Sequence, residues 1–345
     1  ATTFSTITAS FTVATPAADN YLVVRSTDAT LNTNPVNGTN YSVGSSLGNG
    51  TVVAYTSNPS FTDNGLTHST LYHYFVFAAN DVCTGGPLYN LTSPLTQSAS
   101  TSVPSIITSA QTGNWSDAAT WVGGVVPTDL NAVVIANGHT VHLDLPSATI
   151  TNKADSCFKI TIDNGGSLDA LGTTAMLVIK DNAVNNGIIN LYTTDGATPA
   201  VETYATLKFI GSSNNSFTGT GSTDLKELQV VKGSGNVTTS SPVLDINLSN
   251  LTVKDANTNG FIQTSNLAGI VKFSGTATIS NPLFLIAAYS IPSTAGIWLN
   301  NANFTVSGQA GDATLNGMLK ITAGTYNVGA TLAQRLTIAS GAKFF

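Results

Sequence analysis

The sequence predicts an all-β chain in which an N-terminal β-sandwich is followed by a parallel β-solenoid. Three observations lead to this fold class. Strand-length runs that alternate at period two are broken by Asn-Gly turns in the first part of the chain. Two tryptophans and several glycines then mark a compact segment. After it, short apolar strands recur about every twenty residues, with no helix-period stretch between them.

The 345 residues exceed what one hydrophobic core usually organises, so two or three domains are expected. The changes in pattern place them at residues 1–103, 104–165 and 166–345. Two cysteines, Cys83 and Cys157, fall in the first and second of these domains. They either form one disulfide that ties the two domains together or remain two unpaired small apolar side chains.

The amino-acid composition indicates which classes of protein this chain fits. Charged residues make up 9% of the chain, against roughly 25% in an average soluble domain, and Thr, Ser, Asn and Gly carry the polarity instead. Such a surface suits repetitive β-structure in secreted adhesins and fibres. The net charge is −6 and the 12 basic residues form no cluster, so nucleic acid is not an expected partner. No apolar run approaches the roughly 20 residues that cross a bilayer, so the chain is not expected to span a membrane.

The first domain, residues 1–103, has the pattern of short antiparallel strands. The expected strands are residues 4–13, 21–25, 51–55 and 72–77. Phe61 to Leu66, followed by Thr70 to Val76, resembles the fibronectin type III signature, in which a Leu, a short turn and a Thr-x-Tyr precede an alternating strand. That resemblance makes Tyr72 the tyrosine-corner residue, with its ring in the core and its hydroxyl bonded to nearby backbone.

The start of this domain departs from the fibronectin pattern. The aromatic residue usual on the second strand is replaced near Val13 and Ala14, and little sequence precedes Phe4 to serve as the first strand. A missing first strand leaves an exposed sheet edge, through which strand donation could join another chain. The simpler interpretation is that residues 1–7 supply a shortened edge strand.

Residues 104–165 hold Trp115, Trp121, a Gly-Gly-x-x-Pro turn and two β-branched runs hinged on Asn137-Gly138. Over residues 111–170 these elements resemble the eight-glycine extracellular domain found before β-helices in hyaluronan-related and bacterial surface proteins. The positions shared with that domain are turn glycines and strand apolar residues. The resemblance therefore implies a structural role for the two tryptophans and carries over no catalytic residue.

Residues 166–345 read as a right-handed parallel β-helix, with an ordinary β-sandwich as the alternative. The strands that recur begin with Leu207, Leu228, Leu251, Val271, Ile297, Leu319 and Leu336. Their spacing of 17 to 26 residues is the size of one coil, in which each strand buries inward side chains on the coil beneath. Asn-rich segments at residues 185–187, 214–215 and 300–301 fit coil corners, because Asn tolerates left-handed backbone.

Two of the repeats, residues 296–308 and 317–326, resemble repeats in large bacterial surface proteins exported by type IX secretion. Together with the fibronectin-like start, this resemblance implies a modular, secreted protein of the cell surface or of an extracellular fibre. The apolar pair Phe344-Phe345 has two interpretations. Either the native polypeptide continues beyond it, which is the commoner explanation, or this solenoid end docks on a neighbour.

Reactive chemistry is sparse. His142 shares a strand face with Asp144 and lies close to His139, but a third ligand for a metal is absent, so a solvated strand face is favoured. The closest acidic group in the repeats is Asp245 with Lys254 and Asp255. Earlier in the repeats stand Glu202, Asp224 and Glu227. Glycan-cleaving β-helix enzymes place several acidic or basic residues on adjacent coils. In this chain the favoured interpretation is that these residues are scattered surface charges.

Aromatic side chains could serve as sugar platforms, among them Trp298, Tyr289 and Tyr326. On balance, the sequence predicts a non-catalytic structural or adhesive surface protein, with self-association or surface glycans as its partners and no cofactor or metal. The alternative is a carbohydrate-binding or polysaccharide-cleaving β-helix protein.

Overall fold

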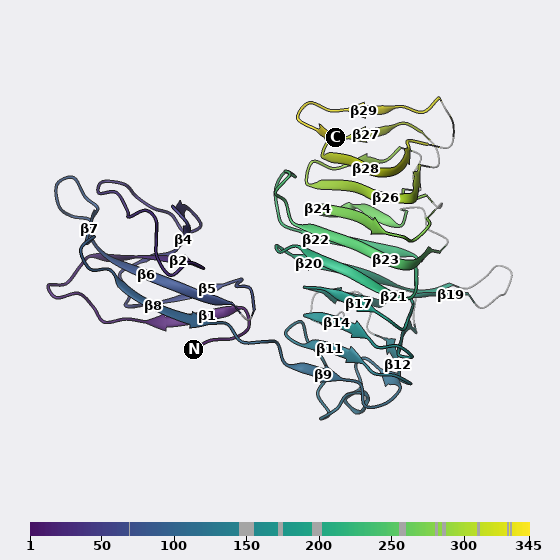
Figure 1. Cartoon of the computed structure of the whole chain (residues 1–345), viewed down its shortest axis with the longest axis horizontal. Coiled ribbons are helices and arrows are strands. Elements are labelled where there is room, and N and C mark those ends of the chain that lie inside the picture. The colour runs from purple at the N-terminus through teal and green to yellow at the C-terminus, as the bar shows by residue number, and fades with distance from the viewer. Residues whose placement is uncertain are drawn as a thin grey trace. The chain divides into compact units, whose positions relative to one another are not determined.

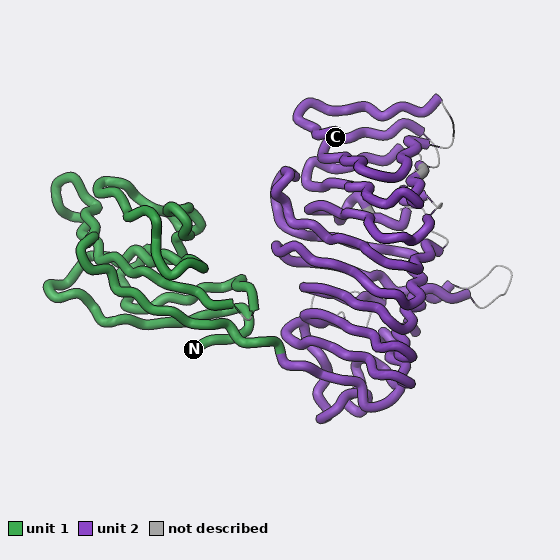
Figure 2. Tube along the Cα trace, viewed as in Figure 1, with its two compact units in different colours: residues 1–104 green, residues 105–345 purple. Residues whose placement is uncertain are grey.

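The computed structural model of the chain forms two compact units, residues 1–104 and 105–345 (Figures 1 and 2). The structure describes residues 1–68, 70–144, 155–171, 175–194, 202–254, 260–279, 282–284, 288–308, 311–329, 331 and 333–345. Within these residues the regular structure is β-strand apart from one 3-10 turn, η1 (Ala118–Thr120). The predicted all-β fold class, with a β-helix-like solenoid, is confirmed.

Unit 1 is a sandwich of antiparallel strands. Its smaller sheet pairs β1 (Thr6–Ser10) with β5 (Ser60–Asn64). Its larger sheet contains β2 (Asn20–Ser26), β3 (Ser46–Leu47), β4 (Gly50–Thr56), β6 (Leu71–Asn80), β7 (Leu88–Tyr89) and β8 (Leu95–Ser100). The order in that sheet is β3-β4-β2-β6-β7, and β8 also pairs with β6. The four strands expected from the sequence overlap β1, β2, β4 and β6.

The larger sheet of unit 1 is buried on both faces. Along β6, Tyr74 packs in a core with Ile7 of the smaller sheet. Phe75 and Phe77 point the other way and pack with Leu22. This two-sided burial explains why β6 reads as a nearly continuous apolar run, because neither set of alternate side chains faces water.

The free edge of β1 is partly covered by the residues before it. The Ala1 ammonium donates a hydrogen bond to Thr8 O at 2.7 Å, and Thr8 N donates to Ala1 O at 2.8 Å. Thr2 forms an antiparallel bridge with Ile7. A short edge segment therefore occupies this part of the sheet edge, which leaves less backbone open to pairing with another chain.

Unit 2 is a solenoid whose strands stack in parallel from coil to coil (Figure 1). We call its three faces A, B and C. Face A carries β9 (Ile106–Thr108), β11 (Ala132–Ile135), β14 (Lys159–Ile162), β17 (Ala183–Asn185), the first parts of β21 (Asn215–Leu225), β23 (Val243–Val253), β26 (Ala295–Ser307) and β28 (Met318–Asn327), the last part of β24 (Ile262–Gly275), and β30 (Lys343–Phe344).

Face B carries β10 (Gly113–Asn114), β12 (Thr140–Leu143), β15 (Ser167–Ala170), β18 (Ile188–Asn190) and the later parts of β21 and β23. Face C carries β13 (Asp155–Cys157), β16 (Ala175–Ile179), β20 (Glu202–Gly211), β22 (Glu227–Lys232) and the first part of β24. β25 (Ser290–Ile291), β27 (Ala313–Leu315) and β29 (Leu336–Ile338) form a further parallel sheet, and β19 (Tyr192–Thr194) pairs antiparallel with β20.

Residues at matching register form rows along the stack. One inward row of face A is apolar throughout and consists of Ile107, Val133, Ile160, Ala183, Phe217, Ile246, Phe273, Leu299 and Ile321. All of these except Ile321 are buried. Each side chain packs on its counterparts one coil above and below, so the core of unit 2 is a continuous stack rather than a single globular centre.

The repeat inferred from the sequence is correct over part of the chain. Val271, Ile297 and Leu319 occupy one row of face A, as the recurrence predicts. Leu207 and Leu228 also pair directly, but on face C. The segments that begin at Leu251 and Leu336 pair elsewhere, on face B and in the β27–β29 sheet.

The Trp/Gly segment is not a separate compact body. Its strand β11 pairs in parallel with β9 and with β14, and β12 pairs in parallel with β15. These pairings continue directly into the stack of the later coils. Residues 105–165 therefore lie in the same unit as the repeats, and the structure shows two units where the sequence suggested three domains. Trp115 and Trp121 belong to the continuous solenoid core.

Two asparagines are buried where the chain turns between faces. Asn185 Nδ2 donates hydrogen bonds to Ser222 O at 2.8 Å and Thr223 Oγ1 at 2.9 Å, while its Oδ1 accepts from Gly187 N at 3.1 Å. Asn301 repeats the motif, because its Nδ2 donates to Ala277 O. These amides satisfy backbone groups of their own coil and of a neighbouring one, which fixes the corner.

Candidate functional site

An outward row of face A brings together the most distinctive polar side chains of unit 2. It consists of Ser216, Asp245, Lys272, Trp298 and Lys320, each in register with the next. Neighbouring strands lie about 4.8 Å apart, so side chains of one row are within reach of one another. We call Lys272, Trp298 and Lys320 the Lys-Trp-Lys column.

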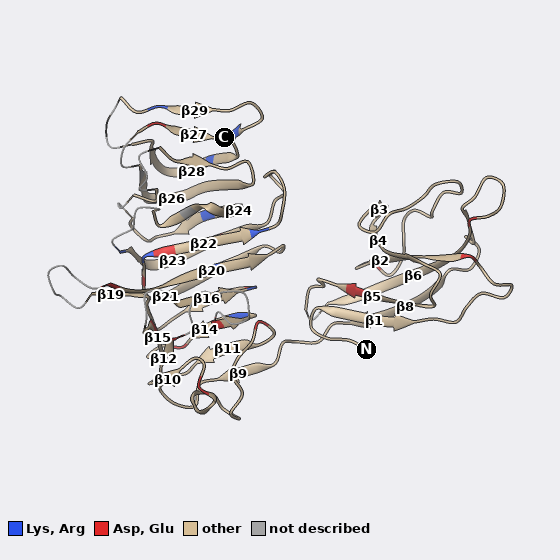
Figure 3. Ribbon diagram, turned by 180° about the vertical axis from the view of Figure 1, so that it is seen from behind, with Lys and Arg blue, Asp and Glu red and all other residues tan. Residues whose placement is uncertain are grey.

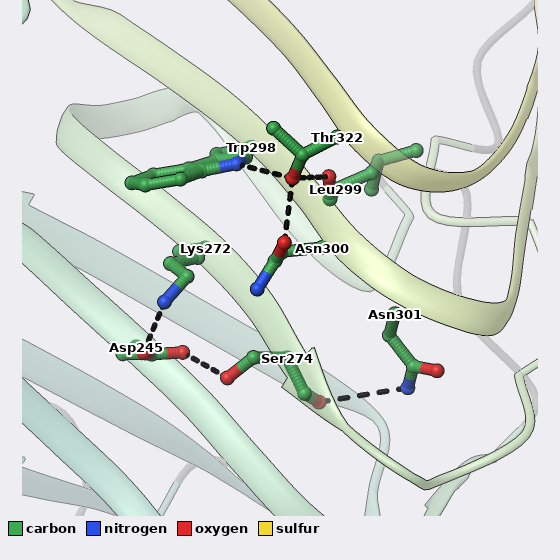
Figure 4. A network of polar contacts seen from close by, with 8 residues as sticks. All are labelled: Asp245, Lys272, Ser274, Trp298, Leu299, Asn300, Asn301 and Thr322. Atoms are coloured by element: carbon green, nitrogen blue, oxygen red, sulfur yellow. Dashed lines mark hydrogen bonds and ion pairs between the residues drawn. The ribbon is translucent and has the colours of Figure 1, made fainter.

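Two neighbouring members of this row, Asp245 and Lys272, form an ion pair. Lys272 Nζ lies 2.7 Å from Asp245 Oδ2, and the two side chains are 19% and 28% exposed. Ser274 donates a hydrogen bond to Asp245 Oδ1 (Figure 4). Both oxygens of Asp245 are therefore engaged, so this carboxylate is a structural partner of Lys272 rather than an open acid.

Trp298 is held between two lysines. Lys272 Nζ lies 4.9 Å from the centroid of its ring and Lys320 Nζ lies 3.9 Å from it, both within cation–π range. Its Nε1–H donates a hydrogen bond to Thr322 Oγ1 at 3.0 Å, and Thr322 in turn contacts Asn300 Oδ1 at 2.6 Å (Figure 4). The orientation of the indole is thus fixed by contacts on its edge and on its faces.

The column is supported from the side by residues 233–242, which connect β22 to β23. Val237 in this segment is buried against Ile270 and Met318, and Trp298 packs on the same small cluster. Val237 N donates to Ser293 O at 2.7 Å, and Lys343 Nζ donates to Val237 O at 3.0 Å. The segment therefore spans several coils beside the column.

A second outward row, on face B, contains the histidine considered in the sequence. Its members are Asn114, His142, Asp169, Asn190, Asp224 and Thr252. His142 Nδ1 lies 2.5 Å from Asp169 Oδ1, and Lys254 Nζ lies 3.1 Å from Asp224 Oδ2. These contacts link adjacent coils.

The two neighbouring histidines are not brought together as a site. His139 Nδ1 lies 2.9 Å from Ser109 Oγ, whereas His142 contacts Asp169. Asp144 accepts hydrogen bonds from Ser116. Among the described residues, no group of three His, Cys, Asp or Glu side chains is arranged to hold a metal ion.

The acids considered as a catalytic group are dispersed in the same way. Glu202 pairs with the buried Lys226, and Glu227 accepts hydrogen bonds from Thr206 and Gln229. Asp224 pairs with Lys254 and Asp245 with Lys272. Asp255 lies outside the described residues. Figure 3 shows acidic and basic residues spread over many coils of unit 2.

Two lysines are buried in ways that the sequence did not reveal. Lys226 is 3% exposed and its ammonium lies 4.8 Å from the ring centroid of Tyr204. Lys232 is 1% exposed, and burial lowers its pKa to about 8, while the charge of Asp181 acts in the opposite direction. The only sequence signal for Lys232 is its place directly after the strand segment 228–231, in which three of the four residues are apolar.

The residues predicted to be structural lie in the cores. Tyr72 is buried, and its hydroxyl accepts a hydrogen bond from Thr67 N at 3.0 Å, the geometry of a tyrosine corner. Trp115 and Trp121 are buried edge to face, with centroids 5.1 Å apart, and Trp121 Nε1 donates to Trp115 O at 2.8 Å. Neither ring has a face open to a sugar.

The other tyrosines proposed as platforms also face inward. Tyr289 is 2% exposed, and its hydroxyl lies 2.6 Å from the Tyr326 hydroxyl. Burial raises the pKa of Tyr326 well above its ordinary value. Of the aromatic residues considered above, Trp298 and Tyr326 remain partly exposed, and Tyr326 packs against the solenoid core.

Of the two alternatives for the cysteines, the structure favours two unpaired thiols. Cys83 and Cys157 are both free thiols. Cys157 is fully buried in the core of unit 2, in one inward row with Ile179 and Phe209, and burial raises its pKa. Its sulfur therefore faces apolar neighbours and not a surface where a second cysteine could reach it.

Comparisons of this chain with protein-family models, with curated proteins and with solved structures return no match. Among the described residues, none of the helical structure has the length and apolar character needed to cross a lipid bilayer.

Proposed function

We propose that this chain is a non-catalytic structural and adhesive protein, secreted to the cell surface or into an extracellular fibre. The observation that carries the proposal is the unbroken inward row of face A from Ile107 to Ile321. Because every coil shares backbone hydrogen bonds and packed side chains with the next, such a stack resists bending and stretching.

The pairing of charges supports the same proposal. Ion pairs join residues of different coils, as in Asp245 with Lys272 and Asp129 with Lys180, whose atoms are 2.7 Å and 2.5 Å apart. Glycoside hydrolysis needs two carboxyl groups on either side of one bond, with one of them available as an acid. Carboxylates bound to lysines instead link coils to one another.

Secretion by a type IX system and assembly into filaments belong to this proposal. Their support is the low charge content, the Thr- and Asn-rich surface and the resemblance of the repeats to exported surface proteins.

Three measurements on the purified full chain test this function. Beads coated with the protein are expected to attach to glycan-covered surfaces, and electron microscopy at high protein concentration is expected to show end-to-end or lateral association. Incubation with anionic and neutral polysaccharides is expected to release no new reducing ends or unsaturated products. Product release that disappears in the Asp245→Asn variant would overturn the non-catalytic assignment.

A further inference from the structure

We propose that the Lys-Trp-Lys column of face A binds an anionic polysaccharide, a linear glycan that carries carboxylate or sulfate groups. The inference rests on the adhesive role proposed above and names the chemistry of its ligand. It starts from the contacts around Trp298, which decide what kind of sugar the column can accept.

The lysines occupy the positions that a neutral sugar would need. Lys272 and Lys320 come from the coils on either side of Trp298, and their ammonium groups lie within 4.9 Å and 3.9 Å of its ring centroid. A sugar ring stacks on an indole only where a face of the ring is open. The column therefore offers a ligand the positive charge of two ammonium groups that rest on the indole. It does not offer an open aromatic face on which a sugar could stack.

The charges of the column are not equally neutralised. Lys272 is paired with Asp245. Within the described part of the chain, no ion pair joins Lys320 to a carboxylate. Lys343 lies on the next strand of face A, in register with Met318, and its ammonium donates to a backbone carbonyl, Val237 O, rather than to an acid. Positive charge therefore increases along the stack from Asp245 toward Lys343, in a protein whose net charge is −6.

The geometry suits an extended polymer. The strands that carry Lys272 and Lys320 are two coils apart, about 10 Å along the stack at the usual strand spacing. Their ammonium groups both lean toward Trp298, at 4.9 Å and 3.9 Å from its ring centroid. Ser274, Asn300 and Thr322 place hydroxyl and amide groups beside the column (Figure 4). A linear glycan offers hydroxyls for these groups together with repeated anionic charges for the lysines. Three lysines are few for a nucleic-acid backbone, whose binding depends on many phosphate contacts.

The column is held in place before any ligand arrives. The hydrogen bond from Trp298 Nε1 to Thr322 and the packing of Trp298 beside Val237 restrict the indole. Gly296 contributes because a Cβ there would lie 2.8 Å from Met318 Cε and 3.1 Å from Ile270 Cγ1, so the absence of a side chain lets this cluster close. Binding to a restricted surface loses less conformational entropy than binding to mobile lysines.

The test measures binding of the full chain to immobilised glycans at low ionic strength. The probes are heparin for sulfate groups, polygalacturonate for carboxylates, dextran as a neutral polymer and a DNA duplex as an unrelated polyanion. We expect binding to at least one of the two anionic glycans, weakening with added salt as charges are screened, and no binding to dextran.

The variants make the assignment specific. Lys320→Ala is expected to weaken binding at least fivefold, and Lys320→Glu to abolish it. Asp245→Asn is expected to strengthen binding about threefold, because it releases Lys272 from its partner. Lys208→Ala, which removes a lysine from face C, is the matched control and is expected to leave affinity unchanged. Thermal unfolding by circular dichroism verifies that each variant is folded.

Equal affinity of wild type and Lys320→Ala for the anionic glycans would overturn the inference, as would dextran binding of the same strength. Equal or tighter binding to DNA would also overturn it, because the column would then act as a general polyanion site. None of these results touches the structural role or the absence of turnover, which are measured by microscopy and product release.

Discussion

Lys232 Nζ donates a hydrogen bond to Asn215 Oδ1, and both side chains are buried in the wall of unit 2. Asn215 Nδ2 in turn donates to Asp181 Oδ1 at 2.7 Å. A lysine in this position is costly to charge, and burial lowers its pKa to about 8 from 10.5.

The depressed pKa of Lys232 predicts a rise of stability with pH. Between about pH 8 and pH 10.5 the unfolded chain binds the proton and the folded chain does not, so the free energy of unfolding increases with pH in this window. Below pH 8 both states are protonated and the contribution is constant. The full difference is on the order of 3 kcal/mol, from about 1.4 kcal/mol for each pKa unit.

Denaturant unfolding at pH 7.5 and pH 10 measures this effect. Tryptophan fluorescence reports unit 2 alone, because Trp115, Trp121 and Trp298 all lie in it. Wild type is expected to gain stability relative to Lys232→Met as the pH rises. Lys208→Met, which removes a partly exposed lysine, should follow the wild-type curve. Parallel curves for wild type and Lys232→Met would contradict the assignment.

The two cysteines should differ strongly in reactivity. Cys83 is partly exposed, whereas Cys157 is fully buried with a raised pKa, so little reactive thiolate is present at Cys157. Iodoacetamide at pH 8 is expected to add one label to the native chain, at Cys83, and a second only after denaturation. Peptide mass spectrometry locates the labels. Failure of the denatured, unreduced protein to take up two labels would instead indicate a disulfide.

Tyr72→Phe tests the tyrosine corner of unit 1. The substitution leaves the buried ring but removes the acceptor for Thr67 N, which is expected to cost about 1 kcal/mol. Tyr41→Phe is a suitable control, since Tyr41 is less buried and its hydroxyl accepts a more exposed hydrogen bond from Val36 N at 3.1 Å. Calorimetry should show a lower transition temperature for unit 1 in Tyr72→Phe and no change in the fluorescence-detected unfolding of unit 2.

The sequence predicts the strands of this protein better than their partners. Alternation and turn residues are local signals, and they located β1, β2, β4 and β6. Coil spacing is not local, because insertions change the length of a coil without changing the strand pattern. Residues 233–242 are such an insertion, and the Leu251 segment after them falls on face B instead of following Leu228 on face C.

The candidate column was partly visible in the recurrence. Lys272, Trp298 and Lys320 each stand between two apolar residues of a repeat, so aligning those repeats aligns the column. The contacts among these residues and the pairing of Lys272 with Asp245 depend on the parallel register of the strands. The support from Val237 depends on a connecting segment that is distant in the sequence. Burial of Lys226 and Lys232 was hidden for the same reason, since a charged residue in a sequence is normally assigned to the surface.

The buried corner asparagines lead to the last prediction. In Asn185→Leu, a side chain of similar size replaces the amide, and Gly187 N and Ser222 O lose the hydrogen bonds that Asn185 makes to them. Each unsatisfied buried group costs about 1 to 3 kcal/mol, so we expect unit 2 to lose about 3 kcal/mol or more. Asn186→Leu changes the exposed neighbour and is expected to alter stability by about 0.5 kcal/mol or less.

Fluorescence-detected denaturation compares these variants, with Asn301→Leu as an independent copy of the same motif. Asn301 Nδ2 donates to Ala277 O, and its Oδ1 accepts from Asn303 N at 2.9 Å, so its loss should resemble that of Asn185. Similar stabilities for Asn185→Leu and Asn186→Leu would mean that the corner amides do not hold the coils together. A large loss at Asn185 and Asn301 alone would show that buried amides, together with the apolar rows, determine where the solenoid turns.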